Sequence, residues 1–284
     1  MALTASIVVH KTPRIQLEKA LNSLLKSEVE TVFILENSPD PLLRSITQVD
    51  PRIIYQHIEN RGFGHGHNTA IRQILESNKE AINGLHLVMN ADIWWENDII
   101  QPLVNYMHKN PEVGMIMPKV YYPDGDLQLT CRMLPTPFDL FAKRFLPGCM
   151  TRKKMERYLL ADHNHDVELN SPYLLGSFLL FRNKALAEIG GFDERFFMYP
   201  EDIDITRRIH RRWKTMYWPG VSIIHEHQAA SRKSSKMLKI HILNMIKYFN
   251  KWGWFRDKER KEFNLRLRSS ITFQQPSLRP SSRG

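Results

Sequence analysis

Cysteine is scarce in this sequence, long apolar runs are absent, and most of the chain carries little net charge. Cys131 and Cys149 are the only two cysteines in 284 residues, and no metal-ligand spacing surrounds them. This scarcity argues against a disulfide framework or a structural zinc site and is typical of a reducing cytoplasm. The longest apolar stretches, such as residues 178–181, are far shorter than the roughly 20 residues that span a bilayer. The first ten residues lack the basic region of a signal peptide, so we expect a cytoplasmic protein.

The positive charge is confined to one end of the chain. The net charge is +10, with 42% hydrophobic and 25% charged residues, a composition typical of a soluble globular protein. From Arg232 onward there are fourteen Lys and Arg against three Asp and Glu, which leaves residues 1–231 with a charge of −1. Nucleic-acid binders usually spread basic residues over the folded face, so we expect no nucleic-acid partner. The distribution predicts a main domain over 1–231 and a basic extension over 232–268.

The basic extension has the pattern of an amphipathic helix. Its apolar residues fall close to one helical face, and lysines surround them. The apolar set is Leu238, Ile242, Met245, Ile246, Phe249 and Trp252. Two interpretations stay open and can coexist: a helix that lies on an anionic bilayer, and a helix that packs on the main domain. The composition of residues 269–284 predicts disorder.

Strands alternate with helices along the main domain. Short β-rich runs occupy residues 5–9, 31–35, 52–58, 85–89 and 113–117. Helical patterns lie between them, two of which begin near Asn68 and Glu96. This alternation predicts an α/β fold with a mostly parallel central sheet flanked by helices. Ligands of such sheets bind beyond the carboxyl ends of the strands, so the residues that follow each strand are the candidate site.

The segments after the second and third strands suit a nucleotide. Glu36 and Asn37 follow the second strand and could contact a nucleobase or ribose, or form an ordinary turn before Pro39. The third strand is followed by NRGFGHGHN, whose glycines Gly62 and Gly64 allow a close approach of the backbone to a ligand. A dinucleotide fingerprint needs a further glycine where His67 stands, so we do not expect a dinucleotide site.

Possible metal ligands follow the fourth strand and the last one. Asn90 and Asp92 stand two apart after the strand at 85–89, and such oxygen donors can hold a divalent cation against phosphates. His225 and His227 follow a short strand near residues 221–224 and project to the same side. They are either half of a metal site or part of a polar edge strand.

Three carboxylates follow a dense aromatic cluster. Glu201, Asp202 and Asp204 come directly after FFMYP. Carboxylates beside apolar side chains are costly unless they are paired, bound to metal or used in chemistry. They could simply compensate the dipole of a helix that begins near Glu201, with Arg207 or Arg208 as partners.

Taken together, these motifs resemble a known family. The segments NRGFGHGHNTAI, VMNADI, GSFLLFRNKALAEIGGFDERFFMYPEDIDITRRI and IIHEHQAAS, in this order, resemble the family 2 glycosyltransferases with a GT-A fold. Within that family they are most similar to bacterial rhamnosyltransferases of O-antigen and cell-wall polysaccharide synthesis. The resemblance covers about residues 4–254.

The resemblance implies roles for particular residues. Asp202 would be the catalytic base, with Glu201 and Asp204 bracing the site together with Arg208. Asp92 and His225 would bind Mg²⁺ or Mn²⁺. The sequence departs from the family pattern at two positions: Asn90 stands where the family has the first aspartate of its D-x-D motif, and Glu36 stands where the family has an aspartate in the nucleotide pocket. The nucleotide-sugar site would comprise Val9, Glu36, Asn37, Asn60, Gly62, Gly64, Asn68, Asn90, Asp92 and Arg208.

The resemblance also implies a reaction. It indicates inverting transfer of L-rhamnose from dTDP-rhamnose to a saccharide acceptor, in the form of a polyprenyl-diphosphate-linked glycan. The enzyme would then lie peripherally on the inner face of the cytoplasmic membrane. The alternatives are a UDP-hexose donor, a metal-dependent nucleotide-sugar hydrolase that uses histidines such as His65 and His67, and a non-catalytic nucleotide-sugar binding protein.

Overall fold

The structure is a computed structural model that describes residues 2–77, 79–139, 148–226 and 235–274. The strands are β1 (Leu3–Val9), β2 (Thr31–Glu36), β3 (Ile53–His57), β4 (Leu85–Met89), β5 (Ile93–Trp94), β6 (Val113–Tyr121), β7 (Cys131–Arg132), β8 (Leu169–Asn170), β9 (Tyr173–Leu174), β10 (Phe178–Arg182) and β11 (Lys214–His225). The helices are α1 (Arg14–Leu24), α2 (Phe63–Ser77), α3 (Ile100–Lys109), α5 (Gly148–Tyr158), α6 (Asn183–Ile189), α7 (Glu201–His210), α9 (Ser235–Trp252) and α10 (Lys258–Gln274), with 3₁₀ turns at Arg44–Gln48 and Lys79–Asn83.

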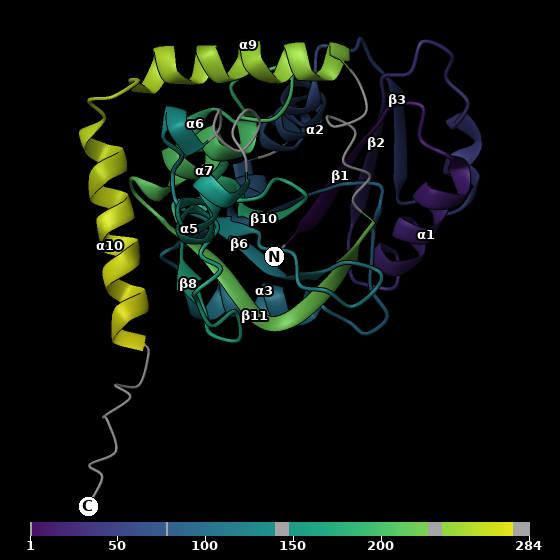
Figure 1. Ribbon diagram of the computed structural model, residues 1–284. Coiled ribbons are helices and arrows are strands. Elements are labelled where there is room, and N and C mark those ends of the chain that lie inside the picture. Colours follow the sequence, from purple (N-terminus) through teal and green to yellow (C-terminus); the bar gives the residue numbers. More distant parts are fainter. Residues whose placement is uncertain (1, 78, 140–147, 227–234, 275–284) are drawn as a thin grey trace, which may run out of the picture.

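One twisted sheet forms the centre of the molecule (Figure 1). Its strand order is β3-β2-β1-β4-β10-β6-β11-β5, and β8 pairs with β11. The β1–β2, β2–β3, β1–β4 and β6–β11 pairs are parallel, whereas β10 is antiparallel to β4 and β6. The carboxyl ends of β1, β2, β3, β4, β6 and β11 therefore meet at one edge, where β10 begins. The predicted mostly parallel α/β sheet is confirmed.

The expected strands are found, and several boundaries differ. The five strands predicted first correspond to β1, β2, β3, β4 and β6. The short strand expected near residues 221–224 is the end of β11, whose twelve residues pair with β6 through two register shifts. The helix expected near Glu96 begins at Ile100, and α7 begins at Glu201 as predicted.

Helix α2 begins five residues before the predicted start at Asn68. Gly64 and Gly66 are therefore helical, and each is small because a neighbour leaves no room. A Cβ on Gly64 would lie 2.8 Å from Cβ of Phe192, and one on Gly66 would lie 2.5 Å from Val8. At both glycines, the position of the missing side chain faces other protein atoms. Close packing of α2 therefore explains these glycines without a ligand.

The basic extension packs on the main domain. Met245, Tyr248 and Phe249 of α9 are buried in a second apolar cluster with Tyr173 and Phe196. Figure 1 shows α9 crossing above α6 and α7, with α10 descending beside the body. The packed interpretation of this helix is therefore correct. Helix α10 continues to Gln274, so the prediction of disorder from residue 269 is wrong for 269–274; residues 275–284 lie outside the described residues. No helix within the described ranges is long and apolar enough to cross a membrane.

Candidate active site

The predicted metal ligands meet at the carboxyl edge of the sheet. The antiparallel pairing of β5 with β11 places His225 opposite Ile93, and the backbone N–H of Glu226 donates to the carbonyl of Asp92 at 2.9 Å. This pairing brings Nε2 of His225 to 3.4 Å from Oδ1 of Asp92. The structure therefore brings together two residues that are 133 positions apart in the sequence. His227, the other histidine of the motif, lies outside the described residues.

The orientation of the His225 ring is fixed by Gln128, which no sequence motif identifies. The Gln128 side chain donates from Nε2 to the carbonyl of His225 at 2.7 Å, so its Oε1 must face the ring. Oε1 lies 2.9 Å from Nδ1 of His225 and accepts a hydrogen bond from it. In the neutral ring the proton is then on Nδ1, and the lone pair of Nε2 points toward Asp92. Metal-binding histidines are commonly held in one tautomer by such a bond.

The chemistry of this pair fits a divalent cation. Oδ1 of Asp92 is buried and accepts no hydrogen bond within the described ranges. A carboxylate oxygen and an imidazole nitrogen that face each other suit a cation placed between them. No cluster of three His, Cys, Asp or Glu side chains that could hold a metal occurs in the part of the chain that the structure describes. Mg²⁺ sites commonly use one or two protein ligands and complete the shell with substrate phosphates and water.

Asp202 is connected to this pair through the loop before β10. The backbone N–H of Asn90 donates to the carbonyl of Ser177 at 2.9 Å, and the N–H of Gly176 donates to Oδ2 of Asp202 at 3.1 Å. Gly176 must be glycine because an added Cβ would lie 2.9 Å from Cβ of Asp202. The Tyr173 hydroxyl donates to the same carboxylate oxygen at 3.4 Å. Residues 176–177 thus join the end of β4 to the start of α7.

The two first carboxylates of α7 differ in protonation. Burial, together with the charge of Asp202, raises the pKa of Glu201 well above its usual range. Burial also raises the pKa of Asp202, to about 6, while hydrogen bonds from the N–H groups of Gly176 and Ile203 oppose the rise. These shifts favour the neutral form of Glu201, whereas Asp202 is mostly ionised at pH 7, the state that a general base needs.

Asp204 is a structural residue in this fold. It is fully buried, and its two oxygens accept bonds from Arg208 at 2.7 Å, from Lys251 at 2.5 Å and from the Trp252 indole at 2.8 Å. Arg208 also donates to the carbonyls of Ile189 and Gly191. The Arg208 guanidinium is thus hydrogen-bonded within the protein, and its contact with the donor stays a prediction.

The predicted nucleotide residues gather at the ends of β1 to β3. The N–H of Asn37 donates to the carbonyl of Val9 at 2.9 Å. His10 links the Asn37 side chain, 2.9 Å away, to that of Asn60 at 3.4 Å. These groups remain candidates for nucleotide contacts. Glu36 is different, because its buried carboxylate accepts bonds from Tyr55 and from the N–H groups of residues 42 and 43. Those hydrogen bonds lower the pKa of Glu36 against the effect of burial.

Two further predicted contacts are occupied by protein. The buried amide of Asn68 donates to the Phe192 carbonyl and to Glu194, and it accepts from the Phe192 N–H at 2.8 Å. Gly62 has φ of 105°, and a Cβ there would lie 2.2 Å from the Phe197 carbonyl oxygen. Asn68 and Gly62 therefore hold the segment 191–197 in place, and this segment leads into α7 and its carboxylates.

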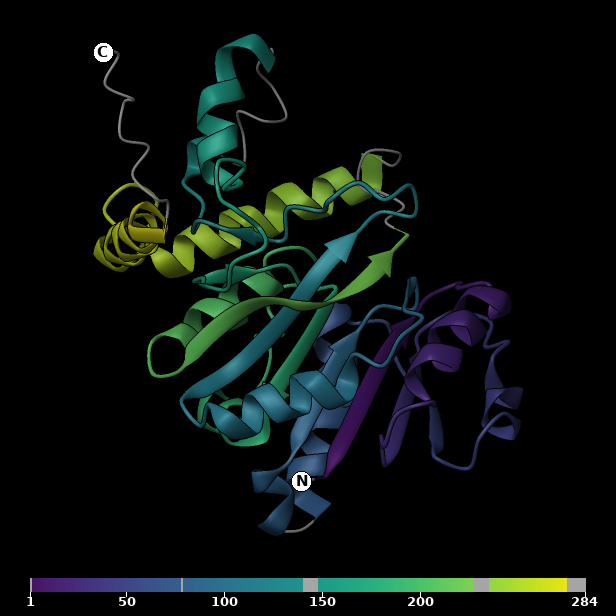
Figure 2. The same cartoon turned by 90° about the horizontal axis from the view of Figure 1, so that it is seen from below.

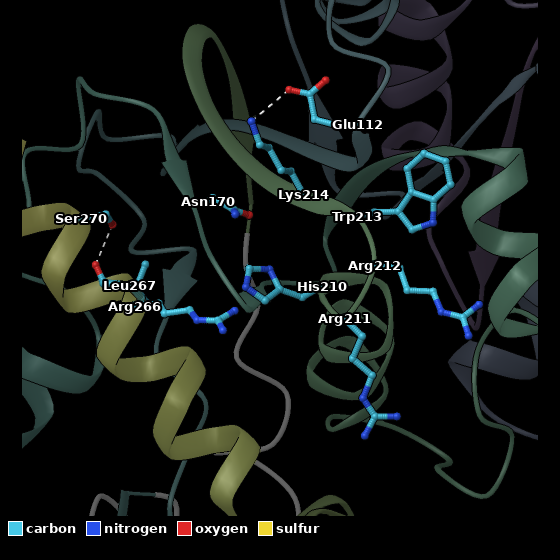
Figure 3. Close-up of a pocket in the computed structure, with 10 residues that line it drawn as sticks. All are labelled: Glu112, Asn170, His210, Arg211, Arg212, Trp213, Lys214, Arg266, Leu267 and Ser270. Carbon is cyan, nitrogen blue, oxygen red and sulfur yellow. Dashed lines mark hydrogen bonds and ion pairs between the residues drawn. The ribbon is translucent and has the colours of Figure 1, made fainter.

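A pocket of about 360 Å³ lies elsewhere, at the beginning of β11 (Figure 3). Lys214 and His210 line it, whereas His225 is at the opposite end of that strand. Its charges are largely paired, Lys214 with Glu112 at 2.9 Å and Arg211 with Glu259 at 2.6 Å. This pocket is separate from the candidate site.

Comparison with known proteins identifies the family. The model of the glycosyltransferase-like family 2 matches residues 9–267, which include every element of the candidate site described above. The chain is a family 2 glycosyltransferase.

Two relatives of this glycosyltransferase are named for rhamnosyl transfer. It is 27% identical to the N-acetylglucosaminyl-diphospho-decaprenol L-rhamnosyltransferase of Mycobacterium tuberculosis, over 98% of this chain and 94% of the relative. It is 25% identical to the rhamnosyltransferase WbbL of Escherichia coli K12, over 76% of this chain and 81% of the relative.

Solved structures confirm the GT-A fold of the glycosyltransferase. GalNAc-T7 with UDP, GalNAc and Mn²⁺ matches 97% of this chain with a TM-score of 0.61 and 14% identity, and the chain spans 58% of that longer protein. The mannosyltransferase PcManGT of Pyrobaculum calidifontis, solved with GDP-Man and Mn²⁺, matches 96% of this chain and 76% of its own with a TM-score of 0.54 and 14% identity. At this identity the likeness shows the fold alone.

The histidines of the hydrolase alternative are held elsewhere. His65 lies 2.9 Å from Glu194, and the fully buried His67 bonds to Ser6 at 2.7 Å. Neither histidine forms a metal cluster with Asp92 and His225 within the described ranges. The family and the geometry both favour a transferase.

Proposed function

We propose that the protein is an inverting rhamnosyltransferase, which moves L-rhamnose from dTDP-rhamnose to a polyprenyl-diphosphate-linked saccharide during surface polysaccharide assembly. The observation that carries the proposal is the hydrogen-bonded connection of Asp202, through residues 176–177, to the end of β4 that leads to Asp92, which faces His225. The names of the relatives in Mycobacterium tuberculosis and Escherichia coli support the sugar, and the first of them supports the acceptor.

Each residue has a defined role in this reaction. Asp92 and His225 would hold Mg²⁺ or Mn²⁺, which stabilises negative charge on the leaving diphosphate. Asp202 takes the proton from the acceptor hydroxyl while the oxygen of that hydroxyl forms a bond to the anomeric carbon of the donor sugar. The bond from that carbon to the phosphate oxygen breaks, and dTDP leaves. A single displacement by one base inverts the anomeric configuration, and neutral Glu201 adds no second charge to repel Asp202.

Donor preference can be tested without knowing the acceptor. We expect dTDP-rhamnose with Mn²⁺ or Mg²⁺ to raise the melting temperature more than UDP-glucose, UDP-galactose or GDP-mannose does. A ligand at about 100 times its dissociation constant stabilises the native state by about 2.7 kcal/mol, or roughly 5 to 10 °C. Asp92→Ala should reduce the metal-dependent part of the rise. A larger rise with a UDP-hexose would replace the proposed donor, and no rise with any sugar nucleotide would count against transfer.

The same assay tests the metal pair through Gln128. Gln128→Leu removes both bonds that fix the His225 ring, and we expect Mn²⁺ to bind about 10- to 100-fold more weakly, by the usual cost of losing such a partner. The exposed Gln101 of α3 provides the matched control, and Gln101→Leu should leave metal affinity unchanged. Equal Mn²⁺ affinity in the Gln128 variant would mean that the ring needs no such support.

We also propose peripheral association with an anionic membrane, where a lipid-linked acceptor would lie. The first half of α9 exposes Lys236 and Lys239 beside Leu243, which is 48% exposed. Figure 2 shows α5, which carries the exposed basic residues 152–154, projecting from the body. Binding to anionic vesicles should be lost at high salt, and K236E/K239E should weaken it at least about tenfold, since each lysine near the surface contributes about 1 kcal/mol. Equal binding to neutral vesicles would argue against this surface.

A further inference from the structure

Arg132 places a positive charge beside the candidate base. Strand β7 pairs antiparallel with β9, and Arg132 lies opposite Tyr173 in that register. The guanidinium carbon is 5.7 Å from the centre of the Tyr173 ring. The hydroxyl of the same ring donates to Asp202. The small two-stranded sheet thus connects a cation to Asp202 through one aromatic side chain.

No carboxylate forms a close ion pair with Arg132 within the described ranges. Its Nε donates to the carbonyl of Leu129 at 3.1 Å, and no Asp or Glu oxygen described there comes within 4.0 Å of it. Its electrostatic neighbours are the hydroxyls of Tyr173 and Tyr158 and, beyond ion-pair distance, the carboxylate of Asp202. Burial raises the pKa of Tyr158 to about 12, and that of Tyr173 is also raised, so both are neutral. By contrast, the buried Arg207 pairs with Asp257 at 2.6 Å.

A partly buried guanidinium that no carboxylate contacts directly is suited to an anionic ligand. Loss of hydration is costly to a cation unless an anion or hydrogen-bond acceptors replace the water. The planar fork of arginine fits two oxygens of one phosphate group. The site of the reaction offers two such groups, the diphosphate of the donor and the diphosphate of a lipid-linked acceptor.

The position of Arg132 favours the acceptor. The donor diphosphate belongs at the pair of Asp92 and His225, at the ends of β5 and β11. Arg132 instead lies on β7, opposite Tyr173 of β9, whose hydroxyl donates to Asp202. Asp202 is the residue that takes the proton of the acceptor, so Arg132 is closer in contacts to the acceptor than to the metal pair. We propose that Arg132 binds the diphosphate of the acceptor and so makes the enzyme selective for diphosphate-linked over neutral saccharides. This inference rests on the proposed function.

Two acceptors that differ only in charge test the inference. One is N-acetylglucosamine joined through a diphosphate to a short prenyl chain, and the other is the neutral glycoside of the same chain. Arg132→Gln should lower kcat/KM about 10- to 100-fold for the first, through KM, as expected for loss of a charge-assisted contact. The KM of the neutral acceptor and the KM of the donor should be unchanged, and any effect of the lost charge on Asp202 should lower kcat equally for both acceptors. Arg157→Gln, at an exposed arginine of α5, is the control and should change none of these values.

Other outcomes are distinguishable. An equal loss on both acceptors would overturn the inference and assign Arg132 to the support of Asp202. A raised donor KM would assign it to the donor diphosphate. If the glutamine variant fails to fold, Arg132→Lys keeps the charge but not the fork, and it should still lose several-fold on the diphosphate acceptor alone. Failure of the unaltered protein to transfer to either acceptor would overturn the proposed function and this inference with it.

Discussion

Asp202→Asn is expected to lower kcat by about 100- to 10,000-fold, the usual contribution of a general base. The amide keeps the shape of the carboxylate, and its oxygen can still accept from the Gly176 N–H, whereas its NH2 group then faces the Ile203 N–H. Stability should therefore fall modestly, and donor affinity should change little. Transfer to an acceptor would be measured with saturating donor, and donor binding by the melting temperature. Near-normal kcat in this variant would exclude Asp202 as the base.

Glu201→Gln is the matched control for that variant. Burial raises the pKa of Glu201 well above its usual range, which favours the neutral carboxyl. Glutamine has nearly the same shape and is also neutral, and we expect this variant to keep most of the activity. The opposite result, with Glu201→Gln inactive and Asp202→Asn active, would transfer the role of base to Glu201.

The pH dependence follows from the same residue. Burial raises the pKa of Asp202 to about 6, and a base must be deprotonated to accept the acceptor proton. Activity should therefore be lost as the pH falls through about 6, and kcat at pH 5 should be about tenfold lower than at pH 7. A pH profile that stays flat down to pH 5 would contradict ionisation of Asp202 in this range.

Local pattern was enough to predict the sheet, because its strands are apolar runs bounded by turn residues. It also located Asp92, His225 and Asp202, since each follows or precedes a periodic segment at the ligand-binding edge. Gln128, Tyr173 and Arg132 could not be found in this way. Gln128 matters through bonds to a residue 97 positions away, and Arg132 through a strand pair of only two residues. No local spacing records such contacts.

The same limit explains the residues whose roles are less direct than predicted. The family motifs include Asn68, Gly62 and Arg208, yet the contacts of these residues are with the segment 189–197. Sequence spacing places a side chain near a site but does not say whether it faces the ligand or the chain that supports the site. Which of the two a side chain contacts depends on which groups are packed around it, and that packing depends on the whole fold.

Asp257→Ala is expected to destabilise the protein by at most about 3 to 5 kcal/mol, because it removes the more deeply buried of the two carboxylates that pair with Arg207 and leaves only Glu259, at 2.7 Å. Arg207, on the catalytic helix α7, makes two bonds to Asp257 at 2.6 and 2.7 Å, and both side chains are almost fully buried. Asp257 also accepts from the N–H of Arg260 at the start of α10. The free energy of unfolding would be measured by urea titration. Glu262→Ala on α10 is the control, since its exposed pair with Arg266 should contribute at most about 1 kcal/mol.

The same change should also reach the active site, because the extension holds the segment that leads into α7. The Asn244 amide donates to the carbonyl of Met198, and Lys251 pairs with Asp193 and Asp204. Tyr199, at φ of 93°, packs its ring 4.6 Å from that of His241 directly before Glu201 and Asp202. A strained residue of this kind persists only where surrounding contacts enforce it. We therefore expect kcat of the folded Asp257→Ala protein to fall while that of Glu262→Ala does not, and unchanged kcat would show that α9 and α10 stabilise the fold without positioning Asp202.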